Sequence, residues 1–133
     1  MKRILLAAAL SLFCLQPVHA DKVHVPKPGS PERQAIMDGL RGWLKSRKLF
    51  PGQDVVFQVD HLKVHNGWAW VSATPQTRKD GRILAETGTW LLRFKDGAWK
   101  SVDYPELVDE EPDAIFLKKL HKTHPDVPAD IFD

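Results

Sequence analysis

The spacing of apolar residues changes once along the chain, from a helical repeat to a strand repeat. Before Pro51 the apolar residues recur at the i, i+4, i+7, i+8 spacing of one helix face, and from Val55 onward they alternate with polar ones. Ser30-Pro31-Glu32 is a typical helix start, so the first segment predicts a long helix over about Pro31 to Arg47. The change of period restricts the chain to an α+β fold with the helix first. The helical stripe consists of Ile36, Met37, Leu40, Trp43 and Leu44.

Four strands with short connections are predicted after this helix. Asn66-Gly67 is the strongest hairpin signal, because a type I′ turn needs positive φ at both central residues. The apolar phase slips at Asp60-His61, which predicts a β-bulge there. Strands joined by such turns form a curled antiparallel meander. The expected strands cover about 55–64, 68–74, 85–94 and 99–104, with a tight turn at 95–98.

A short second helix is expected near the end of the chain. Pro112-Asp113 suits a helix start, and the acidic run 109–111 places carboxylates at the same end. Apolar residues at 115–117 and at Leu120 form the stripe of this helix, which His124-Pro125 ends. Ile131-Phe132 is expected to pin the tail onto the domain.

The amino-terminal 20 residues have the order of a secretory signal peptide. Lys2 and Arg3 precede an apolar run from Ile4 to Leu15, and cleavage is expected after Ala20. The run is too short for a stable membrane anchor. Cys14 follows Phe13 rather than the small residue that lipoprotein processing needs. We therefore expect a signal peptide over 1–20, an extended leader over 21–29 and a single α+β domain over 30–133, located in the periplasm or secreted.

The charge of the expected mature chain excludes one class of partner. Without Lys2 and Arg3 the 19 basic residues become 17, which equals the 17 acidic residues. A neutral domain without a cluster of Lys and Arg is a poor partner for nucleic acid.

Several segments resemble a family of small exported bacterial proteins of uncharacterised function, and the helix-then-sheet order resembles the cystatin-like and NTF2-like folds. The resemblance implies the fold and an export route, and it carries over no catalytic residue. A cystatin-type inhibitor loop would need a glycine that residues 53–57 lack, so protease inhibition by that route is not expected. The segments that carry the likeness are 32–41, 56–64, 67–71 and 97–100.

Both faces of the predicted sheet are apolar, which leaves two interpretations open. Trp68 and Trp70 project from one face of their strand, while Trp90 belongs to an apolar stripe on the next strand. Either the second helix or the tail covers the far face, or an aromatic patch is exposed there. Such a patch would serve a homodimer or bind an envelope protein, a peptide or a glycan. Partner-binding candidates are Trp68, Trp70, Trp90, His61 and His65.

Catalytic and metal sites are weakly supported by the sequence. Asp60 beside His61, or Asp103 beside Tyr104, would suit an acid–base pair in an NTF2-like cavity. A metal site needs three or four converging ligands, which no compact motif supplies, and no cofactor is expected. The sequence therefore predicts an exported, non-enzymatic binding or interaction protein of the bacterial envelope. The alternative is a small NTF2-like enzyme with an Asp/His-lined cavity.

Overall fold

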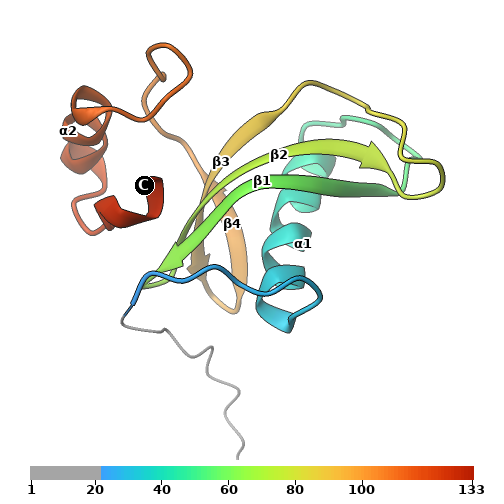
Figure 1. Cartoon of the computed structure of the whole chain (residues 1–133), viewed down its shortest axis with the longest axis horizontal. Coiled ribbons are helices and arrows are strands. Elements are labelled where there is room, and N and C mark those ends of the chain that lie inside the picture. Colours follow the sequence, from blue (N-terminus) through green and yellow to red (C-terminus); the bar gives the residue numbers. More distant parts are fainter. Residues whose placement is uncertain (1–21) are drawn as a thin grey trace, which may run out of the picture.

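Two helices, one short 3₁₀ helix and a curled four-stranded antiparallel sheet form the part of the chain that the computed structural model describes, residues 22–133 (Figure 1). The α+β class and the curled antiparallel sheet are thus as predicted. The predicted signal peptide, residues 1–20, lies outside the described residues. The elements are α1 (Pro31–Ser46), β1 (Val55–His65), β2 (Trp68–Thr77), β3 (Gly88–Lys95), β4 (Ala98–Val102), α2 (Ala114–Thr123) and the 3₁₀ helix η1 (Ala129–Phe132).

The first helix starts where the sequence predicts. The Ser30 hydroxyl accepts a hydrogen bond of 3.2 Å from the Arg33 backbone N–H, and Pro31 occupies the first helical position. The helix α1 has 16 residues and ends at Ser46, one residue before the predicted end at Arg47, so its bounds are nearly as predicted although it is not long. It stops because Lys48 adopts a left-handed backbone conformation with φ of 55°, which turns the chain away from the helix axis.

The sheet keeps the sequence order β1-β2-β3-β4. The predicted hairpin turn is confirmed, because Asn66 and Gly67 both have positive φ, at 50° and 75°. The predicted bulge is also confirmed, as the pairing of β1 with β2 slips between Val59 and His61. The bulge lets Val59 and Leu62 point to the same face although they are three residues apart.

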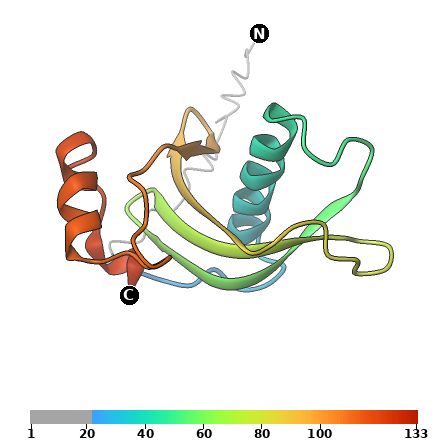
Figure 2. The same ribbon diagram turned by 90° about the horizontal axis from the view of Figure 1, so that it is seen from above.

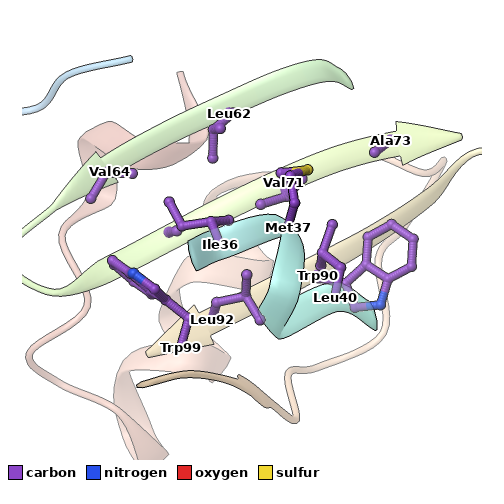
Figure 3. Close-up of a cluster of buried hydrophobic side chains, with 11 residues drawn as sticks. Ile36, Met37, Leu40, Leu62, Val64, Val71, Ala73, Trp90, Leu92 and Trp99 are labelled. Atoms are coloured by element: carbon purple, nitrogen blue, oxygen red, sulfur yellow. The ribbon is translucent and has the colours of Figure 1, made fainter. Parts of the chain in front are cut away.

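The helix α1 packs on one face of the sheet, which curls around it (Figure 2). Small residues of β2 allow this close packing: Ala69, Val71 and Ala73 are all fully buried. They meet Ile36 and Leu40 of the helix (Figure 3). The apolar stripe of the helix and the alternating residues of the strands therefore form the first core.

The opposite face of the sheet is covered by the C-terminal segment, α2 with η1 (Figures 1 and 2). Asp113 caps α2 by accepting a 2.8 Å hydrogen bond from the Phe116 N–H. Ile131 is fully buried, which confirms that the tail is pinned onto the domain. Of the two interpretations left open by the sequence, the structure thus agrees with the first, in which the second helix and the tail cover the far face of the sheet. The second core contains Trp68, Trp70, Leu91, Phe116, Leu120, Val127 and Ile131.

The leader before α1 is also attached to the sheet. His24 and Val64 exchange two backbone hydrogen bonds of 2.9 Å, which pairs the leader with the outer edge of β1. The His24 ring then contacts Glu32 of α1, with 2.6 Å between Nε2 and Oε1. Within residues 22–133, no helix combines the length and the apolar character that crossing a membrane requires.

A single close backbone approach sets the distance between α1 and β4. A Cβ atom added at Gly39 would lie 2.8 Å from the carbonyl oxygen of Trp99, closer than real Cβ contacts come. Since that neighbour is backbone, it cannot rotate away. Gly42, one turn further along α1, has no atom within 4 Å of the same virtual position.

We expect Gly39→Ala to lower the free energy of unfolding by about 1–3 kcal/mol, because the helix must move off the sheet. The matched change Gly42→Ala should raise it by about 0.5–1 kcal/mol, since alanine favours a helix over glycine. Urea unfolding of both variants measures the difference. Equal effects at the two sites would show that α1 and β4 do not touch at Gly39.

Candidate binding site at the end of helix α1

Trp68 and Trp70 lie inside the molecule rather than on its surface. Their exposed fractions are 2% and 3%. The ring of Trp70 contacts the rings of Tyr104 and Phe132, each with 5.0 Å between centroids, and that of Phe116 at 6.0 Å. These contacts come from the C-terminal segment and from the connection that follows β4. An exposed patch of these tryptophans is therefore not present, because α2 and η1 bury it.

Trp90 is buried on the other face of the sheet, with 6% exposed. Its ring meets Trp43 of α1 and Phe57 of β1 edge-on, at 5.9 and 6.1 Å between centroids. The ring folds over Gly88, where a Cβ would come within 2.8 Å of it. Among the described residues, the Trp90 Nε1 is buried without a hydrogen-bond partner. Trp90 therefore belongs to the first core and reaches no ligand surface.

His61 and His65 hold the tail of the chain. His61 Nε2 lies 2.8 Å from the carbonyl oxygen of Ile131, and His65 Nδ1 lies 2.8 Å from the Asp130 carboxylate. The bulge ends before His61, so the regular pairing from His61 to His65 points both rings to the same face. Their visible role is to fasten η1 over the second core.

The two acid–base pairs considered from the sequence are not assembled. Asp60 and Asp103 are exposed, and the Tyr104 hydroxyl donates a 2.9 Å hydrogen bond to the Thr89 carbonyl instead. Burial raises the pKa of Tyr104 above its ordinary value, which favours the neutral hydroxyl that this bond needs. In residues 22–133, no three His, Cys, Asp or Glu side chains gather as a metal ion would require.

A hollow of about 680 Å³ opens where α1 ends and β1 begins, and we call it the α1-end hollow. The last turn of the helix, the connection 47–54 and the first residue of β1 enclose it. Its volume lies within the range of small-molecule sites, and such sites are mostly apolar with a few polar groups. The side chains that line it include Leu44, Lys45, Lys48, Leu49, Phe50 and Val55.

The shape of the hollow follows from the way in which α1 terminates. The Lys48 N–H bonds to the Lys45 carbonyl and the Leu49 N–H to the Leu44 carbonyl, both at 3.0 Å. This is a Schellman motif, and it places Leu49 beside Leu44. The left-handed position is occupied by Lys48 rather than the glycine that usually stands there. Phe50 is left-handed as well, with φ of 52°, which is uncommon for a bulky residue.

The wall and floor of the hollow are apolar. Leu44 and Val55 are buried beneath it, while Leu49 stays 42% exposed although it is a large aliphatic residue. Arg41 closes one side, and its Nε donates a 2.7 Å hydrogen bond to the Val55 carbonyl. An apolar surface partly open to water at such a site is suited to receive an apolar ligand.

A second hollow of about 480 Å³ runs between α1 and β4. Its helix side combines the small residues Ala35, Gly39 and Gly42 with Asp38, Trp43 and Ser46, and its volume is smaller than that of the α1-end hollow. We therefore place the candidate site at the α1-end hollow.

The sequence carried a signal for this site that the search for chemical motifs missed. Leu49-Phe50-Pro51-Gly52 is an apolar connection between helix and strand, where polar residues are the rule. Asn66-Gly67 and Asp96-Gly97, the other tight turns, are polar. An apolar pair in an exposed connection points either to a core contact or to a ligand surface.

Comparisons of the chain with protein-family models, with curated proteins and with solved structures find no match. Its function is therefore argued from the geometry above.

Replacing Trp70 distinguishes a core residue from a binding anchor. Trp70→Ala should lower the free energy of unfolding by about 3–5 kcal/mol, because the cavity cannot be refilled by its neighbours. Ile115→Ala on the outer face of α2, 60% exposed in the native chain, should change it by no more than about 0.5 kcal/mol. Thermal and urea unfolding test both. A stable Trp70 variant would place this side chain outside the core.

The left-handed backbone of Lys48 at the end of α1 leads to a separate prediction. Lys48→Gly should raise the free energy of unfolding by about 1 kcal/mol, since glycine adopts positive φ without the clash of a Cβ. Lys45→Gly, in the regular last turn, should lower it by about as much. Stabilities of the two variants that change in the same direction would contradict the left-handed cap.

Proposed function

We propose that the protein is an exported, non-enzymatic binding protein that takes an apolar ligand into the α1-end hollow. Export is supported by the signal-peptide order of residues 1–20. One helix on a curled sheet of order β1-β2-β3-β4 supports assignment to the cystatin-like or NTF2-like folds. The proposal moves the binding surface away from the sheet, where the sequence alone had favoured it.

One observation carries this proposal: Leu49 is left open to water at the mouth of an apolar hollow built on a strained backbone. Leu44 and Val55 below it are already buried, so a ligand that covers Leu49 would complete an apolar surface. Burial of an aliphatic side chain contributes about 1.5–3 kcal/mol. Unfavourable backbone conformations at Lys48 and Phe50 are typical of sites where function, rather than stability, sets the geometry.

The enzyme alternative has less support in the geometry. It would need Asp60 or His61 inside a cavity. Asp60 is exposed on β1, and the His61 ring faces the carbonyl of Ile131. Asp54, the carboxylate at the α1-end hollow, forms an ion pair with Arg78 at 2.8 Å rather than a pair with a histidine.

Titration with dodecanol, a neutral aliphatic probe, tests the proposal by amide NMR. We expect shift changes concentrated in residues 44–55, because there an exposed leucine lies at the mouth of an apolar hollow. Leu49→Glu should abolish them, while Ile115→Glu on the outer face of α2 should leave them unchanged. The hollow is not the site if the shifts fall on the α1–β4 side, on the C-terminal segment or nowhere.

A further inference from the structure

The charges around the α1-end hollow indicate which kind of apolar ligand it takes. We propose that the ligand is an aliphatic carboxylate, with its chain against Leu44, Leu49 and Val55 and its carboxylate at Lys45 and Lys48. This inference rests on the proposed function and adds the chemical class of the ligand. The ligand is a single soluble molecule that binds in the hollow.

Lys45 and Lys48 are the two positive charges at the hollow that the fold does not use. No ion pair among residues 22–133 includes either of them. Both line the hollow, three residues apart at the turn that ends α1. Each lysine carries its ammonium group on a long aliphatic stem. The stem can lie along the apolar wall while the ammonium group stays in water.

The other charged groups at the hollow are already satisfied. Arg41 donates to the Val55 carbonyl and binds the Asp38 carboxylate at 2.8 Å, so it acts as part of the wall. Asp54 is neutralised by Arg78. The hollow therefore presents a net positive rim around an apolar floor.

A ligand must match both parts of this surface. A neutral aliphatic molecule would cover Leu49 but leave the two ammonium groups without counterions. A small polar anion would pair with them but bury no apolar area. A molecule with an aliphatic chain and one terminal carboxylate does both, and charged pairs at such exposed positions favour it modestly over the neutral analogue.

Positive and negative charges are unevenly distributed between the two parts of the chain. The segment 31–100 contains 12 basic and 7 acidic residues, whereas 101–133 contains 3 basic and 9 acidic. The C-terminal segment lies on the far side of the sheet from α1 (Figure 2). The acidic C-terminal segment therefore repels an anion, whereas the α1-end hollow lies in the part of the chain that has an excess of basic residues.

The test compares three probes of equal chain length by calorimetry: dodecanoate and dodecyltrimethylammonium below their micelle concentrations, and dodecanol below its solubility limit. Native protein should bind dodecanoate about tenfold more tightly than dodecanol, as expected for two exposed charge contacts. The cationic probe should bind most weakly. The preference for dodecanoate should shrink as salt is raised, since exposed charges are screened.

The double variant Lys45→Gln/Lys48→Gln is the matched test of the rim. Glutamine keeps a Cβ at the left-handed position, so the strain at the helix end is unchanged. Dodecanoate should then bind no more tightly than dodecanol, while dodecanol binding stays as in the native protein. Lys118→Gln/Lys119→Gln on the exposed face of α2 removes the same charge elsewhere and should leave the preference intact.

The outcomes separate the two proposals. If neither dodecanol nor dodecanoate binds, the proposed function fails. If both bind equally, or the Lys45/Lys48 variant keeps the preference, only the carboxylate inference is overturned. Binding to vesicles of anionic phospholipid without binding of monomeric dodecanoate would also overturn it, in favour of a membrane surface.

Discussion

A sheet with apolar side chains on both faces is the constraint from which the rest of this structure follows. Neither face can be left to water, so each needs its own cover. The helix α1 covers one face, and α2 with η1 covers the other. The small side chains of β2 point to α1 and its large ones to the C-terminal segment. This division lets the helix approach closely while the tryptophans fill the wider gap on the opposite side.

The same constraint decides where a binding site can be. Aromatic residues that suit an interface are already used in the two cores, and the histidines of β1 fasten the tail. The binding site proposed above therefore lies at the end of an element, where packing is incomplete. At the end of α1, Lys48 stands where glycine would fold better, and Leu49 stays partly exposed. Residues that lower the stability of the fold at one position are typical of sites that are kept for function.

Much of the fold could be read from local patterns. Three features depend only on neighbouring residues in the sequence: the helix cap at Ser30, the type I′ turn at Asn66-Gly67 and the bulge before His61. The interactions that stabilise each of them lie within a few residues, so a local pattern is enough to predict them. The end of α1 was predicted to within one residue, but the left-handed backbone of Lys48 that ends it gives no signal in the sequence. The site itself was missed, since sequence reasoning weighed residue types that carry chemistry rather than an apolar connection.

The sequence by itself determined the α+β class, the order of strands and the two apolar faces of the sheet, because these follow from the periodicity of side chains along the backbone. Only the tertiary structure decided that Trp68 and Trp70 are buried, that His61 and His65 share a face toward the tail, and that Leu49 is left open beside Lys45 and Lys48. The periodicity of the sequence predicts which face of the sheet a side chain points to. It does not predict which other segment of the chain packs against that face. Trp68 is covered by residues far along the chain, Leu120 at 52 positions and Val127 at 59, and packing decides which residues these are.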